Sequence, residues 1–226
     1  MPAVLGLPAS FGPHLQRWPR GIFQGGILLK LRSPLSEKDA RQLKSGDTVT
    51  LDGLIFSGRD EMHIRALEYA REGRKLPCDL RGGVIFHCGP IMKKVNGHWN
   101  VVAAGPTTSS RMNAMEPEFI ERFGVRAIIG KGGMSQPTVD AMVKFGCVYL
   151  AFTGGAAVLG AEGIVEVKGV EWLDLGMPEA MWELAVKGFG PMTVAIDAHG
   201  NSLYKEVDAK VTKNVAVAKK KLGLLG

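Results

Sequence analysis

The sequence has few cysteines, few aromatic residues and no long uninterrupted apolar run. Three of its 226 residues are cysteines and none lies in a CxxC pair, which argues against a disulfide-held scaffold, a thioredoxin-like motif and a cysteine-rich zinc site. No apolar stretch approaches the roughly 20 residues that a membrane-spanning helix needs. We therefore expect a cytoplasmic protein without a membrane partner, with a prokaryotic cytoplasm and an organelle both left open.

Acidic residues are outnumbered by basic ones, 22 to 28, so the formal net charge is +6. Such a balance is compatible with nucleic-acid binding or with an acidic ligand. The longest run of like charge, Lys219–Lys221, is typical of a solvated helix end. No nucleic-acid motif accompanies it. A basic nucleic-acid-binding module therefore stays an alternative of another class, and we expect no nucleic acid as partner.

Strand-like and helix-like segments alternate along most of the chain. This alternation predicts an α/β fold with a mixed, largely parallel sheet flanked by helices. Asn-Gly at 96–97, between two apolar runs, predicts a hairpin. The expected strands are 27–32, 48–56, 84–88, 92–95, 98–103, 126–129, 147–152, 164–170 and 191–197, and the expected helices are 36–43, 60–71, 118–123, 136–146, 178–187 and 207–222.

The first residues differ in composition from the rest. Residues 1–25 lack acidic side chains and contain four prolines, which break any long apolar or amphipathic helix. We expect residues 1–25 to form an extended N-terminal arm and residues 26–226 to form one domain.

The stretch from Val101 to Met112 draws most attention. A short apolar run ends at Gly-Pro, two threonines and two serines follow, and then comes Arg111. Thr108 or Ser109 can cap a helix whose first turn would attract an anion. A cation in that turn is unfavourable unless an anion lies nearby. The alternative is an ordinary hydroxyl-capped helix with an outward-pointing arginine.

Three loops share one pattern, because each follows an apolar run, is rich in small residues and carries a cation. The cations are Arg59, Arg111 and Lys131. Ligands of open α/β sheets bind beyond the carboxyl ends of the strands. If the three loops meet there, their arginine forks and mobile lysine suit a small dicarboxylate. The alternative is three unrelated solvated charges.

Other binding motifs are absent or incomplete. The segment from Gly124 to Lys131 fails the P-loop spacing, and no glycine cluster matches the dinucleotide fingerprint. His63 is a possible substrate contact, although a surface or capping role is the commoner one. His87 and its neighbour Cys88 would point to opposite faces of a strand, and Cys147 fits a core position. We expect no metal held by this chain alone.

Taken together, five motifs resemble the β subunit, or C-terminal domain, of iron–sulfur-dependent class I fumarases. The L-tartrate dehydratase β subunit is a related resemblance. The similarity covers about residues 27–222, and its motifs are specific in combination rather than singly. They are Ser57–His63, Gly89-Pro90, Gly105–Met112, Gly130–Met134 and Phe152–Ala157.

This resemblance implies a swivelling β/β/α domain that pairs with an α subunit carrying a four-iron four-sulfur cluster, in a heterodimer that doubles. Fumarate and (S)-malate would be interconverted between the two subunits. Arg59, Arg111 and Lys131 then look like clamps for the substrate carboxylates. Thr108 looks like a further substrate contact, and Thr107 like the hydroxyl proposed as catalytic acid. L(+)-tartrate is the alternative substrate within the same class.

Overall fold

The computed structural model describes residues 28–155 and 157–222. Its strands are β1 (Leu28–Arg32), β2 (Thr48–Ser57), β3 (Val84–Phe86), β4 (Ile91–Val95), β5 (His98–Ala103), β6 (Ala127–Gly130), β7 (Val148–Ala151), β8 (Ile164–Glu171) and β9 (Met181–Ile196). Its α-helices are α1 (Glu37–Gln42), α2 (Asp60–Arg71), α3 (Glu116–Phe123), α4 (Gln136–Phe145), α5 (Ala157–Glu162) and α6 (Leu203–Lys221). Two 3₁₀ turns are η1 (Ser109–Met112) and η2 (Leu173–Leu175).

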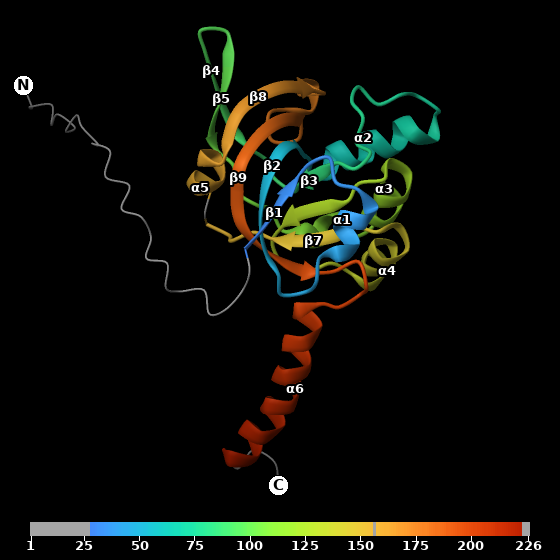
Figure 1. Cartoon of the computed structure of the whole chain (residues 1–226), viewed down its shortest axis with the longest axis vertical. Helices are drawn as coiled ribbons and strands as arrows, with labels where there is room; N and C mark the ends of the chain where they lie inside the picture. The colour runs from blue at the N-terminus through green and yellow to red at the C-terminus, as the bar shows by residue number, and fades with distance from the viewer. Residues whose placement is uncertain (1–27, 156, 223–226) are drawn as a thin grey trace, which may run out of the picture.

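The main sheet closes on itself. Strands β2, β3, β6 and β7 pair in parallel, one after the other. The long strand β9 pairs antiparallel with β7 and also with β2, which completes a ring of five strands (Figure 1). Strand β1 adds in parallel to β2, and β8 adds antiparallel to β9. The α/β class and the mixed sheet are confirmed, but the sheet is less parallel than expected, because β9 pairs antiparallel with β2, β7 and β8. Closure of the sheet was not foreseen.

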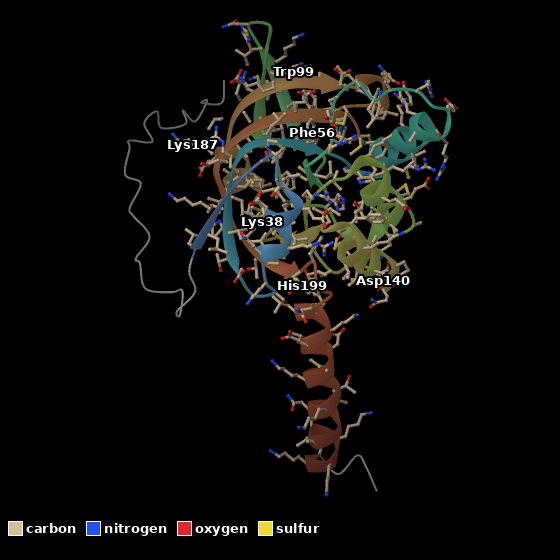
Figure 2. The ribbon with its side chains drawn as sticks, turned by 45° about the vertical axis from the view of Figure 1, so that its right-hand side comes forward. Lys38, Phe56, Trp99, Asp140, Lys187 and His199 are labelled. Atoms are coloured by element: carbon tan, nitrogen blue, oxygen red, sulfur yellow. The ribbon has the colours of Figure 1, made fainter. Side chains whose placement is uncertain are left out.

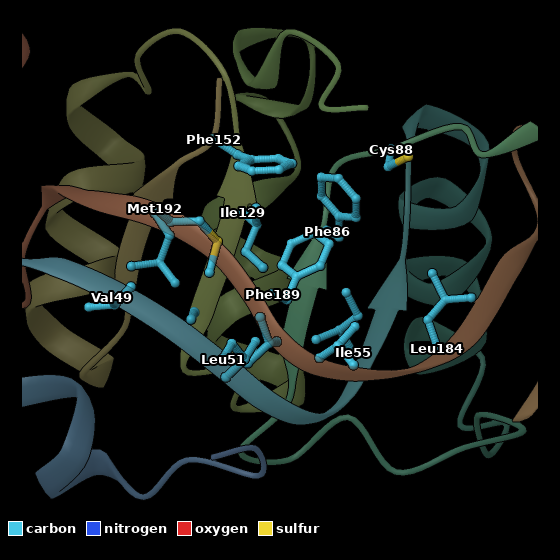
Figure 3. Packing of buried hydrophobic residues seen from close by; sticks show 14 of the residues in the cluster. Val49, Leu51, Ile55, Phe86, Cys88, Ile129, Phe152, Leu184, Phe189 and Met192 are labelled. Carbon is cyan, nitrogen blue, oxygen red and sulfur yellow. The ribbon is translucent and has the colours of Figure 1, made fainter. Parts of the chain in front are cut away.

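The ring encloses an apolar core. Phe86, Phe152 and Phe189 pack edge to face or tilted, with ring centroids 5.2 to 6.1 Å apart. Figure 3 shows them between β2, β3, β6 and β9 with smaller aliphatic side chains around them. Successive strand residues point to opposite faces, so Phe86 enters this core while its neighbour Ile85 points outward.

Helices α2, α3 and α4 cover the outer face of β3, β6 and β7 (Figure 1). Each helix contributes an apolar face, for example Met62 from α2, Phe119 from α3 and Met142 from α4. These side chains pack on Ile85 and Ile128 of the ring. The capping box at Ser36 and the left-handed glycines that end α3 and α4 match the sequence signals for those termini.

One expected helix is wrong. Residues 178–187 were expected to be helical, but Met181 begins β9, which continues to Ile196. The side chains of Trp182, Leu184 and Val186 are buried at every second position, which is the period of a strand. Pro178 lies in the turn before the strand, so a proline that suits a first helical turn misdirected the interpretation. The expected strand at 191–197 is the second half of β9.

The last described helix stands apart from the ring. Helix α6 begins at Leu203, four residues before the expected start, and runs away from the ring (Figures 1 and 2). The proposed arm, residues 1–25, lies outside the described residues. None of the described helices is both long enough and apolar enough to cross a membrane.

Candidate functional site

The three cation-bearing loops meet at one rim of the ring. Arg59 follows the end of β2, and Lys131 directly follows β6. The segment after β5 reaches the same rim through two isolated bridges, Cys88 with Pro106 and Thr108 with Lys131. The carboxyl ends of parallel strands share an edge of a sheet. The expected convergence of these loops at the strand ends is therefore seen in the backbone.

Backbone hydrogen bonds fix the loop that carries the two threonines. The amide of Thr107 donates to the carbonyl of His87 over 2.7 Å, and the amide of Lys131 donates to the carbonyl of Thr107 over 3.3 Å. The amide of Ser109 then donates to the carbonyl of Lys131 over 3.0 Å. The Thr107 and Thr108 hydroxyls make no hydrogen bond to another described residue, so both can serve a ligand.

The expected helix N-terminus at this loop is not an α-helix end. Residues Ser109–Met112 form the short turn η1, and α3 begins only at Glu116. Thr108 stands at the cap position but its side chain makes no capping hydrogen bond. A single 3₁₀ turn has few aligned peptide dipoles. A helix dipole therefore contributes little to the electrostatics of this loop, whose positive charge comes from side chains.

Two of the three cations have carboxylate partners in this chain. Arg59 lies 3.0 Å from Glu179, with both side chains about one-fifth exposed. Arg111 pairs with Asp60, the residue next to Arg59, so the two arginines belong to one charged group. Lys131 is exposed and forms no ion pair with any residue that the structure describes. The arginines are held in place, and the lysine is free to move toward a ligand.

Gly89 allows the Arg59 side chain to lie against the backbone. A Cβ atom at this position would stand 2.6 Å from Arg59 Nη1 and 2.9 Å from Pro178 Cβ. Both distances are below those of real Cβ contacts, so only glycine fits without movement. Gly89 of the Gly-Pro pair at 89–90, which the sequence marks as the end of a strand, thus forms part of the surface against which the predicted clamp Arg59 packs.

A buried polar cluster lies directly beneath the rim. His63, His87 and Glu116 come from α2, the end of β3 and the start of α3, and all three side chains are fully buried. Glu116 Oε2 lies 3.1 Å from His87 Nε2 and 3.5 Å from His63 Nε2. Burial works against ionisation of Glu116, but the two imidazoles beside it outweigh burial and lower the pKa of that carboxyl.

Ser109 and Tyr149 extend this cluster. His87 Nδ1 lies 2.9 Å from Ser109 Oγ, and the Tyr149 hydroxyl donates to the same oxygen over 2.9 Å. Burial raises the pKa of Tyr149, so its hydroxyl keeps its proton and acts as a donor. The cluster thus continues from α2 to β7 under the threonine loop.

Replacing Gly130 by alanine should loosen this arrangement. A Cβ at Gly130 would stand 1.9 Å from Ser109 Oγ and 3.0 Å from the Tyr149 hydroxyl. Forcing an extra carbon into such a packed site costs about 1–3 kcal/mol of unfolding free energy. Chemical denaturation of Gly130→Ala beside Gly169→Ala, whose added Cβ would have no atom nearer than 3.6 Å, measures this. Equal stability of the two variants would contradict the packing described here.

Sequence reasoning missed the cluster. His63 was expected at the surface, as a cap or as a substrate contact, but its ring is buried against Phe119 with centroids 4.4 Å apart. Its partner Glu116 was not considered, because a glutamate in a first helical turn is ordinarily solvated. The buried state of Cys147 was expected correctly. The available signal was spacing, since His63 lies on the inner face of α2 beside Met62, Ala66 and Leu67.

The donors for a metal or an iron–sulfur cluster can be judged from the same geometry. Within residues 28–155 and 157–222, His63, His87 and Glu116 are the one group of three such side chains whose ligand atoms lie within 4.8 Å. Cys88 and Cys147 are buried, and Cys78 is partly buried. Burial raises the pKa of Cys78 and of Cys88 to about 12. None of these three cysteines belongs to the group of close ligand atoms found among the described residues.

One rim of this α/β ring thus carries Arg59, Arg111, Lys131 and the two threonines Thr107 and Thr108. The family described as Fumarase C-terminus matches residues 12–207. This chain belongs to the fumarase C-terminus family, and the resemblance seen in its motifs is confirmed.

Named relatives agree with this family. A putative L(+)-tartrate dehydratase subunit beta of Methanocaldococcus jannaschii is 51% identical over 178 residues, covering 78% of this chain and 91% of the relative. The L(+)-tartrate dehydratase subunit beta of Escherichia coli K12 is 43% identical, covering 78% and 86%. A putative class I fumarate hydratase of Geobacillus stearothermophilus is 44% identical over 80% of this chain, which spans 34% of that longer relative.

Proposed function

We propose that this chain is the β subunit of a class I fumarate hydratase, a hydro-lyase that interconverts fumarate and (S)-malate together with an iron–sulfur α subunit. The observation that carries the proposal is the meeting of Arg59, Arg111, Lys131 and the Thr107–Thr108 pair at one rim, in a member of the fumarase C-terminus family. A four-carbon dicarboxylate presents an anionic group at each end, and this rim has cations on separate loops to receive them.

The residues have distinct roles in this proposal. Addition of water beside a carboxylate builds negative charge on that carboxylate, so fixed cations stabilise the transition state more than the ground state. Arg59 and Arg111, already held by Glu179 and Asp60, supply such fixed charge. Lys131 closes on the substrate from the next loop. Thr107 transfers the proton, and Thr108 orients the substrate by a hydrogen bond.

We assign the four-iron four-sulfur cluster to the α subunit. The cysteines described in this chain are dispersed and have raised pKa values, whereas a cluster needs thiolates gathered in one place. A cluster supplied by the partner contributes Lewis acidity toward the substrate hydroxyl. In the same proposal residues 26–226 form a swivelling domain that closes on the α subunit, residues 1–25 form an arm, and the heterodimer doubles in a reducing compartment such as the cytoplasm.

L(+)-tartrate is the second candidate substrate. Two of the relatives named above are tartrate dehydratase β subunits, and this chain covers 86% to 91% of their lengths. Tartrate carries one more hydroxyl than malate, and a single side chain of either subunit can accept or reject it. The cations and hydroxyls of the rim serve both dicarboxylates equally, so a direct comparison of substrates decides between them.

The experiment is anaerobic co-expression of this chain with the α subunit from the same source. The purified single chain should hydrate no fumarate, and the complex should turn over. Arg111→Ala should lower kcat/KM of the complex about 10–100-fold through loss of a charged hydrogen bond. Arg122→Ala is the matched control, since Arg122 pairs with Glu118 on the surface of α3.

Each outcome has a distinct meaning. A complex that dehydrates tartrate but leaves fumarate unchanged would establish the second candidate. Turnover by the single chain would contradict the shared site. A stable complex that acts on neither substrate would refute the proposed function.

A further inference from the structure

The contacts in the buried cluster beneath the rim determine which ring nitrogens of His63 and His87 must carry a proton. His63 Nδ1 lies 2.7 Å from the carbonyl oxygen of Arg59. A carbonyl oxygen only accepts, so His63 Nδ1 carries a proton. In a neutral imidazole the other nitrogen, Nε2, would then be a bare lone pair. Yet His63 Nε2 faces Glu116 Oε2 at 3.5 Å, and two lone pairs facing each other in a dry interior repel.

His87 does not supply the missing proton. Tyr149 donates to Ser109 Oγ, so the serine hydroxyl is free to donate to His87 Nδ1. His87 Nε2 then carries a proton and lies 3.1 Å from Glu116 Oε2, in a close contact that is not a well-aligned hydrogen bond. This accounts for one side of the carboxylate. The contact with His63 still requires one further proton.

Because the cluster is buried, the presence of that proton has a large effect on the energy of the Glu116 carboxylate. His63 and Glu116 have no exposed side-chain surface, and neither carboxylate oxygen has a well-aligned hydrogen bond among the described residues. A lone buried carboxylate is very costly, whereas a carboxylate beside an imidazolium is paired. Burial lowers the pKa of His63, and the charges of Glu116 and then Asp60 oppose that effect, so the proton in this contact is assigned from the facing lone pairs. A tetrahedral metal site would need a fourth donor or a water, and the cluster is closed to solvent.

The cluster contacts both halves of the rim. His63 holds the Arg59 carbonyl with its ring, and His87 accepts the Thr107 amide with its own carbonyl over 2.7 Å. The Ser109 hydroxyl is hydrogen-bonded to the His87 ring, and the Ser109 backbone amide donates to the Lys131 carbonyl. The Glu116 carboxylate contacts both histidine rings and so connects them. Backbone atoms of Arg59, Thr107 and Lys131 are therefore tied to one buried centre.

We propose that His63, Glu116 and His87 act as one positioning unit, in which an imidazolium at His63 and a carboxylate at Glu116 hold the Arg59 loop at a fixed distance from the Thr107–Lys131 loops. The inference rests on the proposed function for its kinetic consequence and not for its protonation state. A shift of about 1 Å between catalytic groups costs up to roughly 100-fold in rate. The unit thus sets the spacing of the clamps without contacting substrate.

The first test uses the full chain alone, with nitrogen-15 in its histidines. At pH 7, NMR should find a proton on both ring nitrogens of His63 and on Nε2 alone of His87. Glu116→Gln should remove the Nε2 proton of His63, because the amide can donate to that nitrogen while accepting from His87. A neutral His63 in the wild-type chain, or one tightly bound metal ion per chain lost in Glu116→Gln, would overturn the proposal.

The second test uses the active complex. Glu116→Gln should keep kcat/KM within about threefold, because its amide preserves both contacts, and Glu116→Ala should lower kcat/KM about 10–100-fold. Glu118→Gln, on the exposed side of the same helix, is the control and should change neither the NMR signal nor the rate. If Glu116→Ala does not fold, Ser109→Ala should show the loss instead.

Unchanged kinetics in every folded variant would overturn the positioning role. Absence of hydratase activity in the wild-type complex would refute the proposed function alone, since the proton on His63 is measured independently of it.

Discussion

Thr107→Ala should lower kcat of the reconstituted complex by about 10²–10⁴-fold, the usual contribution of a positioned proton donor. The Thr107 backbone is fixed on both sides, by the His87 carbonyl and the Lys131 amide. Loss of the hydroxyl therefore removes the proton-transfer group without moving the loop. Because the clamps persist, KM should change much less than kcat.

Two controls bracket this result. Thr107→Ser keeps a hydroxyl on the same backbone and should retain most of the rate. Ser110→Ala removes an exposed hydroxyl from the same segment and should be silent. Pre-steady-state measurement of the chemical step separates proton transfer from product release. A Thr107→Ala complex with wild-type kcat would remove Thr107 from the mechanism and leave Thr108 as the candidate hydroxyl.

Phe189→Ala should be the most destabilising single truncation among these predictions, at about 3–5 kcal/mol. Phe189 is 1% exposed and packs on Phe86 and Phe152 inside the ring, with centroids 5.4 and 5.2 Å away. Its ring also fills the space beside Gly163, where a Cβ would stand 2.8 Å from a Phe189 ring carbon. Removing it leaves a cavity that the surrounding strands cannot close, because they are joined in a ring.

The destabilisation expected for Phe189→Ala is a large part of the domain's total free energy of unfolding. Domains of this kind are stable by only about 5–15 kcal/mol, and a change of 3–5 kcal/mol lowers Tm by roughly 6–20 °C at this size. Calorimetry or thermal circular dichroism measures the shift. Val165→Ala on β8, where the side chain is 62% exposed, is the control and should move Tm by little. A Phe189→Ala chain as stable as the control would show that the ring interior is not the main core.

Local signals predicted most elements because their causes are local. Ser36 caps α1 through its own side chain, and Asn96 and Gly97 adopt the positive φ angles that their hairpin turn requires. The segment 178–187 failed for the opposite reason. Trp182, Leu184 and Val186 take their burial from the neighbouring strand β8 and from β2, which lies far earlier in the chain, and no local residue type reports the pairing with β2.

Some residues of the candidate site could likewise be predicted from the sequence, and others could not. Arg59, Arg111 and Lys131 stand out in sequence because a cation among small residues after an apolar run is unusual, and their placement needs only the rule for strand ends. Their counter-charges Glu179 and Asp60 could not be assigned to them, since a carboxylate in a loop has no sequence mark of its partner. The role of Glu116 depends on burial that α2, β3 and η1 create jointly.

Closure of the ring by β9 also governs the order in which the chain can fold. Thr48 of β2 pairs with Thr193 of β9, so the contact that completes the barrel joins opposite ends of the described fold. During synthesis, a nascent chain that has reached β7 carries unpaired edges on β2 and β7, which are prone to mispairing. Long-range pairing of this kind is slow. The barrel consequently assembles only after residues 181–196 have left the ribosome, and until then those edges remain open to mispairing.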